Sequence, residues 1–308
     1  MNINKHLFAA YCGMIKSGYD LLDLSDEIVQ KVYEWILTAD FEKNVCEYFL
    51  FAKTNTISVN PYYPRGSDLS AACFFHGGSM DKYIEFLQMC ESQEANNPEF
   101  NKWISKLPSV LEQIENSRTF DGIYQFYCNG VEKRFSDIQK QMEEIETVLK
   151  SKPFRTDISV VFAPNLLQAK FLADYALVED TLYIISGNFW SCAIIHEYLH
   201  IALKPIRSML FDIIHNDGID KYVDVKCMHE LGYLHGNTVE AKAHALDECF
   251  VRALCGVIDK SLDLSWYCQE NVKNGFWAVP RAIDKLAKLS WQDMSLEEIV
   301  IQVANSIE

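Results

Sequence analysis

Residues 189–205 have the sequence FWSCAIIHEYLHIALKP. Its central residues His196, Glu197 and His200 are flanked on both sides by uncharged, mostly apolar residues. Because proline cannot continue a helix, the proline at the end of this run predicts a helix that stops at about residue 203. A helix that is apolar on most sides is expected to be buried.

His196, Glu197 and His200 form the pattern His-Glu-x-x-His. Residues four apart lie on one face of a helix, about one turn apart, so two imidazoles at this spacing can bind one zinc ion. The glutamate after the first histidine lies beside that face, where it can hold a zinc-bound water and take its proton. The pattern therefore predicts two metal ligands, His196 and His200, and a general base, Glu197. The alternative is a buried helix with two structural histidines and an exposed glutamate.

A catalytic zinc site needs a third protein ligand and keeps its fourth position open. The extended pattern HExxHxxGxxH would place glycine at 203 and histidine at 206, but these residues are Leu203 and Ile206. Pro205 also ends the helix between them, which excludes this route to a third ligand. A later helix, predicted from Thr238 to Val257, offers four candidates near one face: Glu240, His244, Asp247 and Glu248.

Glu248 is the preferred third ligand. It lies mid-helix among apolar residues, where an unpaired carboxylate would be costly and a metal ion would explain it. Its alternative partner is Arg252, four residues later, in an ion pair. Glu240 has a structural explanation, since Asn237 and Glu240 have the spacing of a capping box at the helix start. The other three candidates stay open as alternatives to Glu248.

This combination resembles the gluzincin branch of the zincin metallopeptidases, in which a His-Glu-x-x-His helix is followed by a glutamate on a later helix. The segments HEYLHIALKP, residues 196–205, and ECFVRA, residues 248–253, are also similar to a group of poorly characterised bacterial zincin-like proteins. The similarity spans roughly residues 155–260. In gluzincins an aspartate that orients the first histidine often follows the glutamate by four residues. That position is Arg252 here, so another residue must orient the histidines, and Asp247 is a candidate.

The resemblance implies a small sheet before the motif helix, with an edge strand that lies along the cleft and pairs with an extended substrate. Thr181–Ser186 is the expected strand, and an ordinary interior strand is the alternative. Zincins also use a tyrosine or histidine to stabilise the oxyanion. The candidates for this role lie in the segment between the two helices, and a surface position is the alternative for each: Tyr222, His229, Tyr233 and His235.

The rest of the chain predicts an α+β protein that is mostly helical. Amphipathic patterns broken at prolines indicate a helical N-terminal region over residues 1–153, and a zincin-like domain is expected over residues 154–308. Strands are predicted at Asp157–Ala163 and Thr181–Ser186, where β-branched residues are frequent, with a helix between them at Asn165–Ala176. The N-terminal helices are expected to cover the cleft or to recruit a partner.

The composition restricts location and partners. The chain has 308 residues, with 28 Lys and Arg against 43 Asp and Glu, and a net charge of −15, which makes it a poor binder of nucleic acid or of an anionic membrane. Its ten cysteines include no CxxC pair, and several lie in apolar helical runs, which favours free thiols and a cytoplasmic location. Leu7–Ile15 leaves a cryptic export signal open. No uncharged apolar run approaches the ~20 residues of a membrane span, and the oligomeric state stays unknown.

Together these observations predict a zinc metallopeptidase with one Zn²⁺ per chain and a peptide or protein as its substrate. His196, His200 and Glu248 would bind the metal. Glu197 would act as the general base and then pass the proton to the leaving amine. The alternatives are a zinc-binding protein without peptidase activity, acting as a regulator or interaction module, and a structural protein without a metal.

Overall fold

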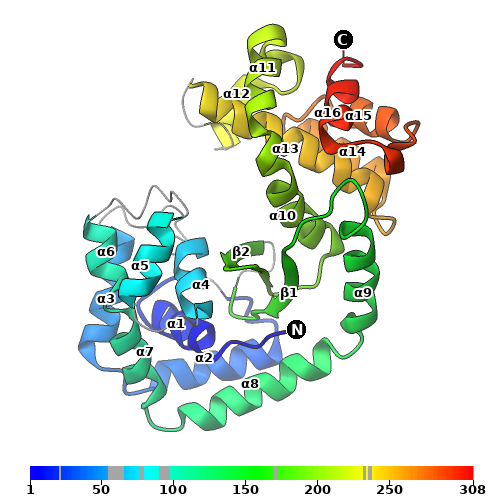
Figure 1. Cartoon of the computed structure of the whole chain (residues 1–308). Helices are drawn as coiled ribbons and strands as arrows, with labels where there is room; N and C mark the ends of the chain where they lie inside the picture. The colour runs from blue at the N-terminus through cyan, green and yellow to red at the C-terminus, as the bar shows by residue number, and fades with distance from the viewer. Residues whose placement is uncertain are drawn as a thin grey trace. The chain divides into compact units, whose positions relative to one another are not determined.

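The computed structural model describes residues 1–20, 22–54, 66–75, 80–89, 98–168, 173–231, 234 and 238–307. Over this part of the chain the protein is mostly helical with one small sheet (Figure 1), which confirms the expected α+β class. None of the helices described is both long and apolar enough to cross a membrane. The chain divides into two compact units: unit 1 comprises residues 1–138 and 158–189, and unit 2 comprises residues 139–157 and 190–308.

Unit 1 consists of helices from the first part of the chain and the sheet. Its helices are α1 (Lys5–Lys16), α2 (Glu27–Thr38), α3 (Lys43–Thr54), α4 (Gly66–Phe74), α5 (Met80–Met89), α6 (Pro98–Ile104), α7 (Leu107–Glu115) and α8 (Phe120–Arg134). Its strands are β1 (Ser159–Pro164), β2 (Ala173–Val178) and β3 (Thr181–Ser186).

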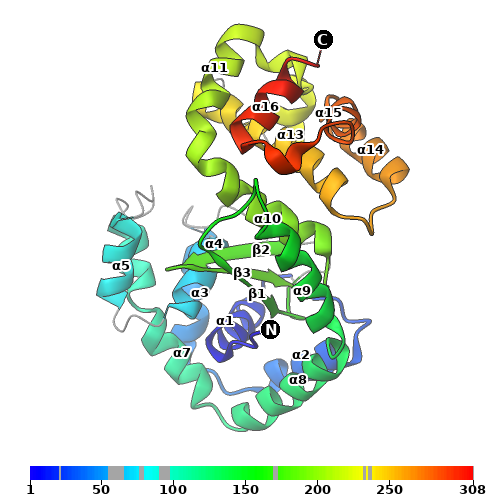
Figure 2. The ribbon, with the colours of Figure 1, turned by 45° about the vertical axis from the view of Figure 1, so that its right-hand side comes forward.

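The sheet has the strand order β1-β3-β2, so β3 is the central strand (Figure 2). β1 pairs with β3 in parallel, with Phe162 opposite Ile184, and β2 pairs with β3 antiparallel, with Tyr175 opposite Ile184. The expectation that Thr181–Ser186 offers a free edge to an extended substrate is therefore wrong. The interior alternative holds, because both edges of β3 are paired within the sheet.

The helix expected over Asn165–Ala176 is wrong, because residues 165–168 form a turn after β1 and Ala173–Val178 forms β2; residues 169–172 lie outside the described residues. Every second residue of β2 is buried, which is the period of a strand with one buried face. α4 packs against β2, and the hydroxyl of Ser70 donates a hydrogen bond of 3.2 Å to Oδ2 of Asp174. Alanine and leucine favour helices, so local propensity predicted a helix here. The segment forms a strand because it pairs with β3 and packs against α4.

α1 forms the core of unit 1. All residues from Leu7 to Ile15 are buried, so the apolar stretch near the N-terminus is a core helix of this unit. α1 packs against α2, α3, α4 and α7. Gly13 permits a close approach, since an added Cβ would lie 2.3 Å from the ring of Phe49 and 2.9 Å from Cδ1 of Ile114.

Among the residues that the structure describes, unit 2 contains helices and their connecting loops but no strand. Its α-helices are α9 (Ile138–Leu149), α10 (Ser191–Leu203), α11 (Arg207–Asp217), α12 (Val225–Leu231), α13 (Val239–Ile258), α14 (Leu264–Lys273), α15 (Val279–Leu286) and α16 (Leu296–Ala304). Three short 3₁₀ helices join them: η2 (Lys204–Ile206), η3 (Ile219–Lys221) and η4 (Trp291–Asp293). α10 and α13 are the two helices on which the sequence places candidate ligands.

α13 is the central helix of unit 2 and packs against α10, α11, α14 and α15. From Ala245 to Ile258 every residue except Arg252 is buried. Gly256 permits close packing with α15, since an added Cβ would lie 2.4 Å from Cδ1 of Ile283. Two carboxylates, Asp247 and Glu248, are therefore buried within an otherwise apolar stretch, which is costly unless both are paired.

α10 is held in unit 2 at its start and in its middle. At the start, the hydroxyl of Ser191 donates a hydrogen bond of 2.6 Å to Oδ2 of Asp259, directly after α13. In the middle, the buried hydroxyl of Tyr198 accepts from the amide of Thr156 at 3.0 Å and lies 3.2 Å from the carbonyl oxygens of Leu149 and Phe154. These contacts fix the helix that carries the histidines.

The two units do not follow the boundary expected near residue 153, because the sheet groups with the N-terminal helices. The amide of Asn2 donates a hydrogen bond of 2.9 Å to the carbonyl of Phe162 in β1. The amide of Leu166, just after β1, donates to the hydroxyl of Tyr127 in α8 at 3.0 Å. The zincin-like arrangement expected over residues 154–308 is thus divided between the two units, with the strands in unit 1 and the motif helix in unit 2.

Candidate metal centre

His196 and His200 lie one turn apart on α10, and their Nε2 atoms are 3.0 Å apart. Their ring planes make an angle of 77°. Each side chain keeps a small exposed fraction, 16% for His196 and 18% for His200, so a ligand from solvent can reach both. The four-residue spacing therefore brings the two imidazoles together as expected.

Glu248 of α13 completes the cluster. Its Oε1 lies 3.2 Å from Nε2 of His200, and its Oε2 lies 3.5 Å from Nε2 of His196. α10 and α13 pack against each other within unit 2, so the three side chains approach from two adjacent helices. Within the described residues they form a group whose ligand atoms are close enough to hold one metal ion.

The separations fit a tetrahedral ion. Zinc bonds of ~2.0–2.1 Å place neighbouring tetrahedral donors roughly 3.3 Å apart. The Nε2 atoms of His196 and His200 are 3.0 Å apart, and they lie 3.5 and 3.2 Å from Oε2 and Oε1 of Glu248, so all three separations are close to that value. Two imidazole nitrogens and one carboxylate suit zinc or ferrous iron, whereas calcium and magnesium prefer oxygen ligands. The residues present therefore fit a transition metal ion, and the donor set alone does not select between zinc and iron.

Asp247 holds the other side of the His200 ring. Its Oδ2 lies 2.5 Å from Nδ1 of His200, while Nε2 of the same ring faces Glu248. Burial by itself would lower the pKa of His200, but the hydrogen bonds to Asp247 and Glu248 raise it to about 10. A carboxylate on the second nitrogen of a metal-binding histidine fixes the ring and its tautomer. Asp247 thus occupies the orienting position suggested by the sequence, on the second histidine.

Glu248 also forms the ion pair that the sequence offered as its alternative explanation. Nε of Arg252 donates to Oε2 of Glu248 at 3.2 Å. Burial by itself would raise the pKa of Glu248, but hydrogen bonds from His196 and His200 and the charge of Arg252 hold it well below its usual range. The ion pair and the cluster coexist: Oε2 of Glu248 faces both Nε of Arg252 and Nε2 of His196, while Oε1 faces Nε2 of His200.

Two residues beyond α13 that the sequence did not indicate support this ion pair. The guanidinium of Arg252 lies 4.3 Å from the ring centroid of Phe276, and its Nη1 is 3.4 Å from Oδ1 of Asn271. Both partners are buried. No sequence signal links Arg252 to positions 19 and 24 residues away, because only the packing of α14 and the following loop against α13 brings them together.

Glu197 follows the first histidine on α10 and is half-buried. Its carboxyl interacts electrostatically with His196, His200, Glu248 and Arg252. Burial raises the pKa of Glu197 above its usual value, against the opposing effect of the histidines. A glutamate with a raised pKa near a metal centre is suited to exchange protons near neutral pH.

The remaining ligand candidates lie outside the cluster. Glu240 is exposed in the first turn of α13. The capping box expected from Asn237 and Glu240 is wrong about the N-cap residue. Thr238 caps the helix, and its Oγ1 accepts a hydrogen bond of 3.2 Å from the amide of Ala241. Asn237 lies outside the described residues. His244 is exposed, and its ring centroid lies 6.4 Å from that of His200, so it borders the cluster without joining it.

Of the four oxyanion candidates, the structure describes two, Tyr222 and His229. Tyr222 is fully buried in the core of unit 2, with its ring centroid 6.1 Å from that of Phe250. Nδ1 of His229 lies 2.8 Å from the carbonyl oxygen of Leu234. Tyr233 and His235 lie outside the described residues.

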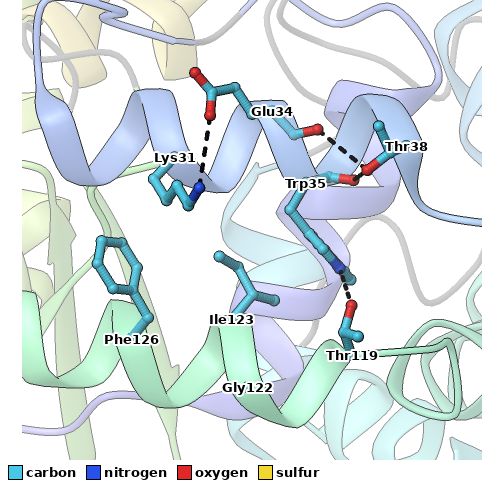
Figure 3. Close-up of a pocket in the computed structure, with 8 residues that line it drawn as sticks. All are labelled: Lys31, Glu34, Trp35, Thr38, Thr119, Gly122, Ile123 and Phe126. Carbon is cyan, nitrogen blue, oxygen red and sulfur yellow. Dashed lines mark hydrogen bonds and ion pairs between the residues drawn. The ribbon is translucent and has the colours of Figure 1, made fainter.

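Unit 1 has an open hollow of about 440 Å³ between α2 and α8 (Figure 3). Trp35, Ile123 and Phe126 give it an apolar lining, and Nε1 of Trp35 donates to Oγ1 of Thr119 at 2.9 Å. None of the candidate metal ligands lines this hollow. This hollow therefore takes no part in the metal chemistry indicated by the sequence.

Comparison with known proteins adds no relative. The chain matches no protein-family model, no curated protein and no solved structure. The resemblance to the gluzincins therefore rests on His196, Glu197, His200 and Glu248 themselves.

Proposed function

We propose that this chain is a zinc-dependent metallopeptidase of the gluzincin type, with one metal ion bound by His196, His200 and Glu248. The observation that carries this proposal is the His196–His200–Glu248 cluster: the two Nε2 atoms lie 3.0 Å apart, and each faces one oxygen of Glu248, at 3.2 and 3.5 Å. Glu197 lies next to His196 on the same helix. Two buried carboxylates on one apolar helix are costly, and a divalent cation offsets that cost. Without metal, Arg252 and the protonated ring of His200 balance the charges of Asp247 and Glu248, and a metal ion would take the place of the His200 proton.

The residues of the site have distinct roles in this proposal. His196, His200 and Glu248 hold the ion, and Asp247 keeps Nε2 of His200 directed at it. When bound, zinc supplies Lewis acidity, which lowers the pKa of water and polarises a carbonyl group. Glu197 accepts a proton from the attacking water on its carboxylate and delivers it to the leaving amine nitrogen. The raised pKa of Glu197 suits both steps.

Metal content is the first test. Elemental analysis for zinc, iron and manganese is made on protein purified without added metal. We expect near-stoichiometric zinc in the wild type, loss of zinc in Glu248→Ala, and retention in the matched variant Glu240→Ala on the same helix. Stoichiometric iron instead of zinc would replace the hydrolytic proposal with iron chemistry. Absence of any metal after supplementation would leave His196 and His200 as structural residues.

Turnover is the second test. We expect the wild-type protein to cleave members of a broad peptide library and Glu197→Gln to lose this activity while it keeps its zinc. Glu240→Gln serves as the control for loss of an acidic group. Full activity in Glu197→Gln would contradict the assignment of the general base.

A zinc-binding protein without peptidase activity is the second candidate, and one observation favours it. The expected substrate-pairing strand, β3, has both edges paired within the sheet, so Thr181–Ser186 itself does not offer a free edge to an extended peptide. Stoichiometric zinc with no cleavage of the peptide library would support this alternative.

A further inference from the structure

Arg252 lies one turn after Glu248 on α13, at the position where gluzincins often have an aspartate. Its Nε donates to Oε2 of Glu248 at 3.2 Å, and only 19% of its side chain is exposed. Oε2 also lies 3.5 Å from Nε2 of His196, and the other oxygen, Oε1, lies 3.2 Å from Nε2 of His200. The two oxygens of the ligand carboxylate therefore have unequal surroundings, because a cation already engages one of them.

The guanidinium of Arg252 is fixed before any metal binds. The ring of Phe276 stacks 4.3 Å from it, and Oδ1 of Asn271 lies 3.4 Å from Nη1. Asn271 is itself held by a bond of 2.8 Å from its Nδ2 to the carbonyl of Tyr267, and the hydroxyl of Tyr267 donates to the carbonyl of Arg252 at 3.0 Å. A planar group held on several sides loses little further freedom when it bonds a carboxylate.

A carboxylate can bind a metal ion through one oxygen or through both. Binding through both oxygens would share Oε2 between the ion and Nε of Arg252 and so weaken the charge-assisted bond to Arg252. Binding through Oε1 alone keeps that bond. The choice matters, because a catalytic zinc ion uses three protein donor atoms and keeps one position open for water.

We propose that Arg252 is a positioning residue that restricts Glu248 to one-oxygen coordination and thereby keeps a four-coordinate site with an open position. This inference rests on the metal centre of the proposed function and concerns its geometry. It assigns to Arg252 the control of the metal-binding mode of Glu248. Asp247 has the separate role of fixing His200.

Cobalt substitution tests the inference independently of activity. Four-coordinate cobalt(II) absorbs visible light several-fold more strongly than five- or six-coordinate cobalt(II), so absorbance per bound ion reports the coordination number. The proteins are the wild type, Arg252→Met, Arg252→Lys and Lys242→Met, each loaded with cobalt. Lys242→Met is the matched control, since it removes a positive charge from the same helix ten residues away. Cobalt content and far-UV circular dichroism are measured on each sample.

We expect intense four-coordinate bands in the wild type and in Lys242→Met. Arg252→Met should keep bound cobalt but lose several-fold in absorbance per ion, and Arg252→Lys should lie between, because it keeps the charge without the planar donor. A folded, cobalt-loaded Arg252→Met with the wild-type spectrum would overturn the inference. Weak bands in wild-type cobalt protein would also overturn it, even if the variants fail to fold. Absence of cobalt and zinc from the wild type would instead refute the metal centre of the proposed function.

Discussion

Asp247 and His200 are joined by the shortest contact at the candidate centre, 2.5 Å between Oδ2 and Nδ1. Asp247 directly precedes Glu248, whose Oε1 lies 3.2 Å from Nε2 of the same ring. Two consecutive carboxylates of α13 therefore contact the two nitrogens of one imidazole on α10. The contact on Nδ1 fixes the ring, and Nε2 is left to face the position that the metal ion would occupy.

Replacing Asp247 by asparagine tests this relationship. An asparagine of the same size cannot supply the negative charge on Nδ1, so we expect zinc affinity, corrected for proton competition at His200, to fall by about 10–100-fold, the usual effect of such a partner. Competition with a chromogenic chelator measures the affinity. Glu240→Gln on the same helix is the control and should leave affinity unchanged. Equal affinity in Asp247→Asn and wild type would show that His200 needs no fixed partner.

The pKa of His200 predicts how metal affinity depends on pH. Without metal, the partners of His200 raise its pKa to about 10, so the ring is protonated at neutral pH. A metal ion must displace a proton from Nε2, so apparent affinity rises as pH rises, by up to about tenfold per pH unit below that pKa. Chelator competition at several pH values between 6 and 8 measures the slope. Asp247→Asn removes the main cause of the raised pKa and should show a weaker slope in this range, whereas a flat profile in the wild type would contradict the prediction.

The sequence predicted the part of the site that depends on local geometry. The spacing of His196 and His200 is sufficient to place two imidazoles on one helical face, and the helix forms as expected. Glu248 was identified by a physical argument, a carboxylate amid apolar residues, and the structure places it in the cluster with the two histidines. These inferences use only the helix period and the cost of burying charge.

The parts that sequence reasoning missed depend on contacts between distant segments. Whether Thr181–Ser186 is a central or an edge strand depends on β2, which residue-level propensity assigned to a helix. The cap of α13 is Thr238 rather than Asn237, a choice between two adjacent residues that both favour this position. The stacking of Phe276 on Arg252 arises only from packing around α13.

Two glycine variants test the packing of unit 1. Gly13→Ala should destabilise the protein by about 1–3 kcal/mol, because the added methyl would overlap the ring of Phe49, 2.3 Å away in the core. Gly122→Ala is the matched control on α8, where nothing lies within 4 Å, and a helix-interior alanine there should stabilise by about 0.5–1 kcal/mol. Urea denaturation followed by circular dichroism measures both changes. If Gly13→Ala left the free energy of unfolding unchanged, α1 and α3 would be able to move apart at no cost in stability.

Tyr198→Phe tests whether the hydroxyl of Tyr198 stabilises the position of α10 without affecting metal binding. The variant removes a buried hydroxyl that accepts hydrogen bonds from the amide and the hydroxyl of Thr156, at 3.0 and 2.9 Å. The amide and hydroxyl of Thr156 and the carbonyls of Leu149 and Phe154 then lose a hydrogen-bond partner. We therefore expect the free energy of unfolding to fall by about 1–3 kcal/mol. Zinc content should stay near that of the wild type, because His196 and His200 keep their own contacts with Glu248 and Asp247.

Tyr33→Phe is the control for this variant, since Tyr33 lies on α2 in unit 1 and is only half-buried. Urea denaturation gives the stability, and elemental analysis gives the zinc content. If Tyr198→Phe lost its zinc while its folded state stayed as stable as that of the wild type, the hydroxyl would act on the metal centre itself. The expected pattern, lower stability with zinc retained, would instead show that Tyr198 secures α10 while the four-residue spacing of His196 and His200 holds the ligands together.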